Sequence, residues 1–438
     1  MFKHIFYTKE RVILLFLFLV GFFDFRYLPR ILSVTGAKSL LVALIFLLIL
    51  GSSDNSNKRI PQTSFNRRLN ILFVALVFSA IINCLSCYVY RDQDVWVTFY
   101  LWSPVFLLFL YYPLKSLNFT IGTWERILFV LFCIEMTVEI VQNLFPNALL
   151  FRMTSGNDKF LNELRCRIYS NGILYIGCLF CLNHALTQKK YSFTFWSLYF
   201  VSIVLMFLSG YRIVIFGIAV SSMVMVLRLK HAKLRVIIAS VVLSSGLYGL
   251  TETQMFINRF DDIIQRQENA NFYNDDYVRM KTLDYYLHDH FKSPAERFLG
   301  SGLCNRVLNA KTNDVGGVKF ESKYSSEMSM LAARYHTYSV DWGLIGFSWE
   351  GGVPAAIILV IIATMLVFFK TNERFLYISS FGIFALIVSI TSGKYHGFHN
   401  LIWTVLLLVM TNKLYQLDRA KKFFKKGQSL KIEDGRKD

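Results

Sequence analysis

The feature that most limits the fold of this chain is its series of apolar runs, each about as long as a helix needs to be to cross a bilayer. Hydrophobic residues make up 54% of the 438 residues, and the mean hydropathy is +0.43, which is more apolar surface than one soluble core could bury. Because a lipid-exposed backbone has to satisfy its own hydrogen bonds, these runs predict helices. We therefore predict an all-α fold, a polytopic transmembrane helix bundle of about twelve spans with one large, partly helical extracytoplasmic loop. The expected spans centre near residues 19, 45, 79, 105, 133, 179, 201, 220, 244, 361, 384 and 406.

The basic residues indicate which side each loop faces. They gather in loops that contain Arg67 and Arg68, Lys189 and Lys190, and Lys233, and in the C-terminal stretch RAKKFFKKGQSLK. With a cytoplasmic N-terminus, and with the one long loop set aside because the positive-inside rule does not govern it, about 26 Lys and Arg fall inside and about 10 outside. The N-terminal apolar run has no small-residue cleavage site, so we expect a retained first helix. The net charge of +18 thus predicts contact with an anionic cytoplasmic leaflet and not with nucleic acid, and both termini are expected in the cytoplasm.

This arrangement divides the chain into four parts. Residues 1–252 are expected to form transmembrane helices 1–9, residues 253–352 a large loop outside the cytoplasm, residues 353–415 helices 10–12, and residues 416–438 a basic cytoplasmic tail. The loop is too long to be a passive connection. Its stretch ANFYNDDYVRMKTLDYYLHDHFKS has apolar residues at spacings of three and four, which predicts a helix that rests on the membrane face.

Three arginines are candidates for binding an anion at the outer membrane surface. In FLSGYRIVIFG a short connection separates two apolar runs, so that a helix on each side would fix Arg212 at the interface. Arg167 in LRCRIYSNG has the same expected depth, and Arg279 in DYVRMKT belongs to the long loop. Guanidinium groups that converge on one pocket suit a pyrophosphate, because each can donate bidentate hydrogen bonds. The competing interpretation is an ordinary interfacial arginine that reaches toward lipid phosphates.

The segment RYHTYSVDWGLIGFSWEGGVP, which precedes the tenth expected span, carries candidates for acid–base chemistry. The imidazole of His336 titrates near neutral pH and could act as a base, and Asp341 could orient it or accept the proton itself. The alternative for both residues is ordinary polar surface.

For three further patterns, a structural role is favoured over a catalytic or ligand-binding role. Two Cys-x-x-Cys pairs lie within apolar stretches without acidic or histidine neighbours, which predicts buried packing. The G-x-G at Gly300 and Gly302 predicts a tight turn, because no strand precedes it. His396 and His399 have no evident third ligand, so we predict no metal site. The cysteine pairs are Cys84 with Cys87 and Cys178 with Cys181.

Three segments together resemble the bacterial O-antigen polymerase and O-antigen ligase superfamily, polytopic membrane proteins with a large periplasmic loop late in the chain. They are SGYR after the seventh expected span, R-x-x-x-x-x-x-Y followed by FLGSG within the loop, and YHTYSVDWGLIGFSWEGG before the next span. Two positions depart from the family pattern. Tyr211 stands where a small hydroxyl residue is common, and Thr337 follows the histidine where Asn is frequent in ligases, which favours a polymerase.

The resemblance implies glycosyl transfer at the periplasmic face of the bacterial inner membrane. A polyprenyl-diphosphate-linked oligosaccharide would be transferred to an acceptor sugar hydroxyl, in surface polysaccharide synthesis and without a cofactor. The arginines would stabilise the departing diphosphate, and His336 or Asp341 would accept the proton. Trp342 and Tyr338 would contact the glycan, although an interfacial aromatic belt explains Trp342 equally well.

Two rival functions remain open besides the choice between a polymerase and a ligase, which would transfer glycan to lipid A core or another acceptor. One is a transporter, such as a lipid-linked oligosaccharide flippase; the other is a non-catalytic partner in polysaccharide assembly. Against a transporter, the sequence shows no paired halves with Gly- or Pro-broken spans. Most ionisable residues are also expected near the outer interface, with Glu135 and Glu139 as the exceptions.

Overall fold

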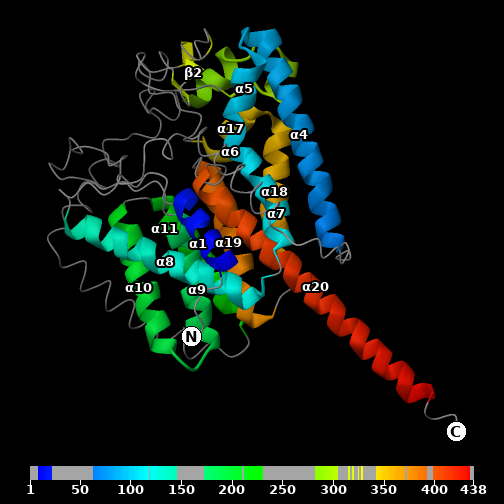
Figure 1. The fold of residues 1–438 in the computed structure, drawn as a ribbon. Coiled ribbons are helices and arrows are strands. Elements are labelled where there is room, and N and C mark those ends of the chain that lie inside the picture. Colours follow the sequence, from blue (N-terminus) through cyan, green and yellow to red (C-terminus); the bar gives the residue numbers. More distant parts are fainter. Residues whose placement is uncertain are drawn as a thin grey trace.

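The described part of the chain is almost wholly helical in the computed structural model (Figure 1), as expected for an all-α protein. The structure describes residues 8–21, 63–117, 119–145, 172–209, 212–229, 282–303, 342–369, 372–391 and 398–434, and short pieces at 314–315, 318–319, 324 and 327–328. Within these ranges the strand content is one two-residue antiparallel pair, β1 (Asp314–Val315) with β2 (Val318–Lys319).

The helical elements follow the apolar runs. In chain order they are α1 (Thr8–Gly21), α4 (Ser64–Arg91), α5 (Val95–Leu101), α6 (Ser103–Phe106), the 3₁₀ turn η1 (Leu107–Leu110), α7 (Tyr111–Ser116), α8 (Ile121–Leu144), α9 (Gly172–Thr187), α10 (Ser192–Ser209), α11 (Arg212–Arg228), the π-helical turn η3 (Tyr285–Asp289), α15 (Pro294–Leu299), α17 (Gly343–Gly351), α18 (Val353–Val367), the 3₁₀ turn η5 (Glu373–Phe375), α19 (Leu376–Thr391) and α20 (Phe398–Asp434).

Three of the described helices are long and apolar enough to cross a membrane: Ser64–Arg91, Ile121–Leu144 and Glu373–Ile390. Four shorter apolar helices accompany them, at Gly172–Thr187, Ser192–Leu208, Ile213–Arg228 and Val353–Val367. These helices fit a membrane protein and coincide with seven of the expected spans. The spans expected near residues 45 and 244 lie outside the described residues, so the number of spans remains a prediction.

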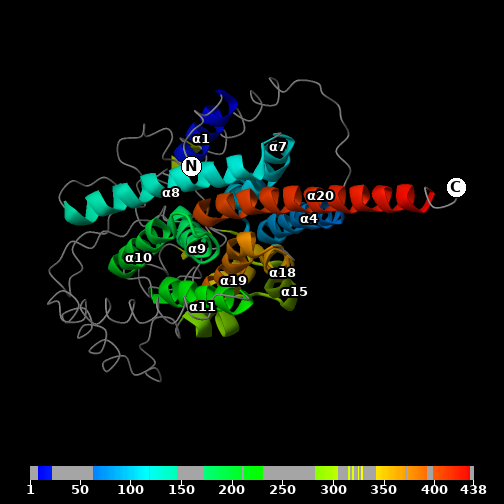
Figure 2. The same ribbon diagram turned by 90° about the horizontal axis from the view of Figure 1, so that it is seen from below.

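The core of the bundle forms around the first half of α20. Nearly every side chain from Asn400 to Asn412 is buried, on all sides of the helix, as expected for a helix enclosed by others. η1, α7, α8 and α9 pack against it. Seen from below, α20 runs through the middle of the assembly, between α8 on one side and α19 on the other (Figure 2).

Contrary to the sequence expectation, the apolar span near residue 105 is interrupted, and a further helix precedes the span near residue 361. Around residue 105, α5, α6, η1 and α7 follow one another through right-handed helical caps, with Pro104 opening α6. Proline lacks the backbone N–H that a regular helix needs, and the chain tightens into a 3₁₀ turn just after it. The span expected near residue 361 is preceded by α17, which is separated from α18 by Gly352 with a φ of +93°.

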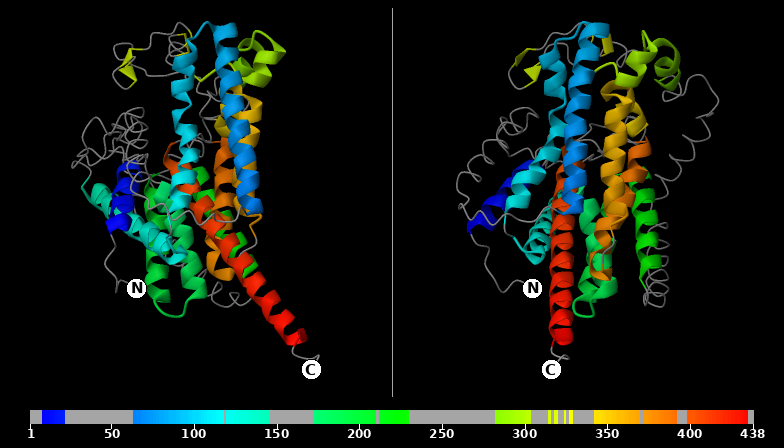
Figure 3. Two further views of the ribbon diagram at one scale, coloured as in Figure 1. Left: turned by 45° about the vertical axis from the view of Figure 1, so that its right-hand side comes forward. Right: turned by 90° about the vertical axis from the view of Figure 1, so that its right-hand side faces the viewer.

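α4 connects the two ends of the bundle. At its N-terminal end, Thr63 Oγ1 donates to Asn412 Oδ1 of α20 at 2.7 Å. At its C-terminal end, Arg91 Nε lies 2.5 Å from Glu296 Oε1 of α15. Both views in Figure 3 show α15 at one end of the bundle and the C-terminal part of α20 projecting beyond the other. The described part of the long loop and the last helix thus extend to opposite ends, which is the relative arrangement that the predicted topology requires.

We therefore expect Lys190 and Lys292 to face opposite sides of a membrane, with Lys292 outside the cytoplasm. Lys190 follows α9, whose His184 lies beside Glu125 near the start of α8, far from the α15 end. Lys190→Cys and Lys292→Cys should both react with a maleimide, because both side chains are exposed. In intact cells an impermeant maleimide should modify position 292 alone, and position 190 should react only after permeabilisation. Modification of both positions from one side would refute the arrangement.

Candidate functional site

Most of the residues predicted to bind substrate or to catalyse lie outside the described residues, so the structure does not test whether they converge. They are His336, Tyr338, Asp341, Arg167 and Arg279. Arg212 is described only as the first residue of α11. Trp342 is described in full, and it immediately precedes α17. The site is therefore built here from the two motif segments that the structure does describe.

Two glycine-containing segments that are far apart in the sequence meet beside the C-terminal end of α4. The backbone N–H of Ser301 donates to Trp349 O, and that of Gly302 donates to Glu350 O, both at 2.9 Å. We call residues 299–302 and 349–352 the glycine junction. Both halves belong to segments that carry the family resemblance, FLGSG and SWEGG, and the structure joins them into one unit.

Close contact between backbones requires glycine at the junction. Gly300 and Gly302 have φ angles of +85° and +94°, which residues with a Cβ atom rarely adopt. A Cβ on Gly300 would come within 2.4 Å of Gly352 N, and one on Gly302 within 2.1 Å of Cys87 Sγ. The prediction of a tight turn at Gly300–Gly302 is confirmed. Cys87 is buried and packs against this turn, in agreement with the predicted packing role.

The first half of the junction is positioned by a short capped helix. Ser293 Oγ accepts a hydrogen bond from Glu296 N at 3.1 Å, and Pro294 opens α15, two features that favour helix initiation. Glu296 is fully buried and holds Arg91 through one carboxylate oxygen and the backbone N–H of Lys292 through the other, at 2.6 Å. Arg91 also donates to His290 O. This buried ion pair ties the end of α4 to the loop, and removing one partner would leave the other charge buried.

Asn83 is the polar residue that holds the junction against α4. Its Nδ2 donates to Leu299 O at 2.9 Å and to Glu350 O at 2.7 Å, one carbonyl from each half of the junction. Its Oδ1 accepts from Trp102 Nε1 at 3.1 Å, just before Pro104. The side chain is fully buried. The interrupted span near residue 105, the end of α17 and the Gly300–Gly302 turn therefore meet at one amide group.

A buried hydrogen-bond network continues from the junction into the loop. His290 Nε2 lies 2.8 Å from Ser301 Oγ, and Tyr324 OH donates to the same oxygen at 2.9 Å. Tyr285 OH lies 3.2 Å from His290 Nδ1. If Tyr285 donates to Nδ1, then Nε2 carries the proton and donates to Ser301 Oγ, and the serine hydroxyl is left to donate to Trp349 O at 3.3 Å. This arrangement satisfies every group with a neutral imidazole.

This network can hold the loop segment in position but cannot act on a substrate. A histidine within hydrogen-bond distance of a serine is the geometry of an activated nucleophile. Here, however, Ser301 is fully buried and His290 is 1% exposed, so a substrate cannot reach either group. His290 lies in the helical stretch quoted from the sequence but was not singled out there. In the structure it directly follows η3, a π-helical turn of the kind that often occurs at functional sites, but this turn is not visible in the sequence.

An aromatic stack borders the network on the side of α17. The rings of Tyr286 and Trp349 stack with centroids 4.4 Å apart, and Trp342 lies 6.1 Å from Trp349. Tyr286 OH donates to Glu350 Oε1 at 3.0 Å. Tyr286 is the tyrosine of the R-x-x-x-x-x-x-Y motif, so this motif also contacts the glycine junction. Trp342, predicted to contact glycan, is half-buried at the edge of the stack.

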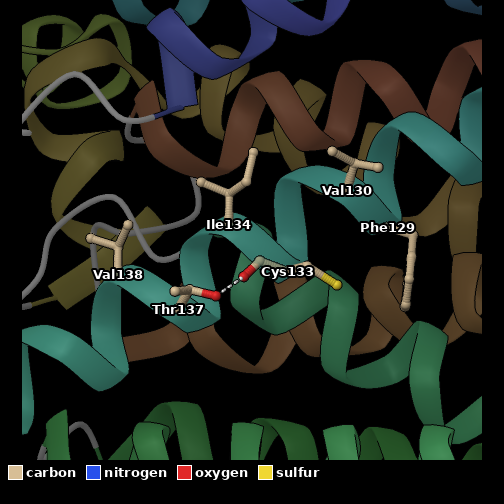
Figure 4. Close-up of a pocket in the computed structure, with 6 residues that line it drawn as sticks. All are labelled: Phe129, Val130, Cys133, Ile134, Thr137 and Val138. Carbon is tan, nitrogen blue, oxygen red and sulfur yellow. Dashed lines mark hydrogen bonds between the residues drawn. The ribbon is translucent and has the colours of Figure 1, made fainter. Parts of the chain in front are cut away.

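Two other places in the described structure were candidates for a site. At the opposite end, Arg374 Nη2 donates to Glu125 Oε2 at 2.7 Å, with His184 and Tyr377 around the same carboxylate; this cluster joins α8, α9 and α19. An apolar pocket of about 340 Å³ opens on α8 (Figure 4), and its lining residues are Phe129, Val130, Cys133, Ile134, Thr137 and Val138. Its one hydroxyl donates to Cys133 O of the same helix at 2.8 Å, so no polar group points into it to select a ligand.

Comparisons of the chain with protein families, with curated proteins and with solved structures found no match. Among the described residues, no group of three or more His, Cys, Asp or Glu side chains could hold a metal ion. The glycine junction and its network are therefore interpreted from their own geometry.

We expect Asn83→Ala to lower the thermal unfolding midpoint of the protein in detergent. The change leaves buried polar groups of Leu299 and Trp102 without their partner, at a cost of about 1–3 kcal/mol for each unsatisfied group. The matched control is Asn70→Ala on the same helix, because Asn70 bonds only the exposed Tyr112 hydroxyl. Its midpoint should stay close to that of the unmodified protein. Equal midpoints for the two variants would refute the role assigned to Asn83.

Proposed function

We propose that this chain is a polymerase of O-antigen or another surface polysaccharide, a metal-independent membrane glycosyltransferase that uses a polyprenyl-diphosphate-linked oligosaccharide as donor. The observation that supports the proposal is the glycine junction. The segments 298–302 and 342–352, which carry the family resemblance, hydrogen-bond to each other, and Tyr286 of a further motif contacts them. Motifs that contact one another across the fold are expected when they build one site.

The proposed reaction needs a site at the depth of lipid headgroups. The donor is an anion anchored in lipid, so that its diphosphate lies at the interface and its glycan extends into the space outside. The junction lies at the end of α4, beside the ion pair of Arg91 and Glu296. Trp342, which directly follows the candidate Asp341 in the chain, lies beside Trp349 of this rigid support.

The chemical step is a displacement at the anomeric carbon of the donor sugar. The acceptor hydroxyl oxygen forms the new bond to this carbon as its proton passes to His336 or Asp341. The bond from the anomeric carbon to the diphosphate oxygen breaks, and the polyprenyl diphosphate leaves with the bonding electrons. Arg212, with Arg167 and Arg279, would stabilise the charge that develops on the diphosphate.

A transporter of lipid-linked oligosaccharide is the second candidate, and one observation favours it. The span over residues 95–116 is interrupted at Pro104, and Gly352 separates α17 from the span of α18; interrupted helices of this kind are typical of transporter binding sites. A ligase differs from the proposed polymerase in its acceptor and not in its donor site. The product therefore distinguishes the two enzymes, whereas the geometry of the site does not.

The experiment that tests the function is glycan analysis of a strain that lacks the gene. A polymerase predicts loss of long chains, with single repeat units still transferred to their final acceptor. A ligase predicts long chains that remain on the polyprenyl carrier. A transporter predicts lipid-linked units retained on the cytoplasmic side. Unchanged surface glycan of every kind would refute all three assignments.

We expect variants of the predicted site residues to separate donor binding from chemistry. Arg212→Lys keeps the charge but loses the planar fork, so polymer formation on purified lipid-linked donor should fall strongly. His336→Ala should slow turnover by about 10²–10⁴ with donor affinity largely retained, and Asp341→Asn should be impaired.

The matched control for Arg212→Lys is Arg68→Lys, an exposed arginine at the N-terminal end of α4, which should remain fully active. Wild-type turnover in His336→Ala would end the proposal for that residue. Inactivity that results only from lost donor binding would reassign His336 to diphosphate recognition.

A further inference from the structure

α4 carries an exposed apolar stripe that marks the depth of the hydrocarbon layer. The exposed side chains recur at spacings of three and four along one face of the helix: Ile71, Val74, Phe78, Ile81, Ile82, Leu85, Tyr88 and Val89. The eighteen residue steps from Ile71 to Val89 cover about 27 Å at about 1.5 Å per residue, close to the roughly 30 Å hydrocarbon core of a bilayer.

Charged and aromatic residues bound the stripe at both ends. The exposed Arg67 and Arg68 precede it, and Arg91 follows it. Trp96, at the start of α5, is 75% exposed just beyond the stripe, where an aromatic belt residue is expected. The position of a residue along α4 therefore gives its depth in the membrane, and the interface on the loop side lies near Val89.

Judged by its contacts with α4, the segment that leads into the glycine junction passes from the interface to a greater depth and then returns to the interface. Lys292 Nζ donates to Tyr90 O at the interface. Leu299 O accepts from Asn83, six residue steps or about 9 Å below Val89. Gly300 O then accepts from Ser86 Oγ at 3.0 Å, and Leu303 O accepts from Gln93 Nε2 at 3.0 Å, beyond the end of α4.

The hydrogen bonding of the turn suits hydrocarbon and not water. The backbone N–H groups of Gly300, Ser301 and Gly302 donate to the carbonyls of Glu296, Trp349 and Glu350. The carbonyls of Leu299 and Gly300 accept from the side chains of α4. Irregular backbone is tolerated at membrane depth only when protein satisfies it in this way. Of the exposed side chains of α15, Phe298 is the large apolar one, at 55% exposure. The exposed Arg297 is held back toward the loop, because it donates to Leu287 O and lies over the Phe291 ring.

We propose that residues 292–303 form a re-entrant segment, which enters the bilayer beside α4 and presents Phe298 to the lipid acyl chains. The inference does not depend on the proposed enzymatic function. If that function holds, the FLGSG motif lies just below the headgroups of the leaflet that holds the donor.

The test is the accessibility of spin labels in proteoliposomes of phosphatidylethanolamine and phosphatidylglycerol. Single cysteines are introduced as Phe298→Cys, Leu85→Cys and Asp284→Cys in a chain whose native cysteines are replaced. Leu85 is the lipid reference, at 53% exposure on the stripe, and Asp284 is the water reference, with a side chain 73% exposed. The label at 298 should collide with oxygen several-fold more readily than with a water-soluble nickel chelate, as at 85 and opposite to 284.

A label at 298 that matches position 284 would overturn the proposal. If the cysteine-free chain does not fold, benzoylphenylalanine is placed at position 298 or 284 of the otherwise unchanged protein. Irradiation should then attach acyl chains at 298 and not at 284. Equal lipid attachment at the two positions, or none at 298, would equally overturn the proposal.

Discussion

The structure depends on one constraint: inside an apolar bundle, every interruption of a helix exposes backbone groups that need partners. α17 ends at Gly351, and the carbonyls of its last turn have no helical partner. The turn at Gly300–Gly302 supplies two N–H groups, and Asn83 supplies its amide, so that this helix end is satisfied without water. The same amide accepts from Trp102 beside the second interruption. A polar side chain on an apolar helix thus joins the end of α17 to the interrupted span at Trp102.

The loop and the bundle form one body for the same reason. The carboxylate of Glu296 binds Arg91 on one side and the backbone of Lys292 on the other, and Arg91 reaches His290, which holds Ser301 of the junction. Glu296, His290 and Ser301 are buried, so their contacts restrain their neighbours more than an exposed pair would. The segment that follows Tyr286 in the chain is therefore fixed to the membrane part, and a site built on it would keep its depth.

Features that depend on neighbouring residues could be predicted from the sequence, and features that depend on contacts between distant residues could not. Apolar runs report local structure, so the helices over Ser64–Arg91, Ile121–Leu144 and Gly172–Thr187 could be expected, and so could the packing of Cys87 and the turn at Gly300. The junction itself could not be expected, because Asn83 contacts partners 216 and 267 residues further along the chain. A lone asparagine within LVFSAIINCLSC gives no sign of its partners, and the break at Gly352 becomes visible only when the backbone that approaches it is known. The predicted site residues around Arg212 and His336 remain predictions, because most of them lie outside the described residues.

The hydrogen bonding at the break between α17 and α18 bears on the choice between a glycosyltransferase and a transporter. A transporter uses a broken span because the freed backbone groups are left to bind an ion or a substrate in a cavity. At the glycine junction these groups are already engaged: Trp349 O accepts from Ser301, and Glu350 O from Gly302 and Asn83. Glycines without room for a Cβ close the remaining space, and the two halves could not separate without losing several buried hydrogen bonds. A break filled in this way serves better as a rigid support for an interfacial site than as a moving gate, and this favours the transferase over the transporter.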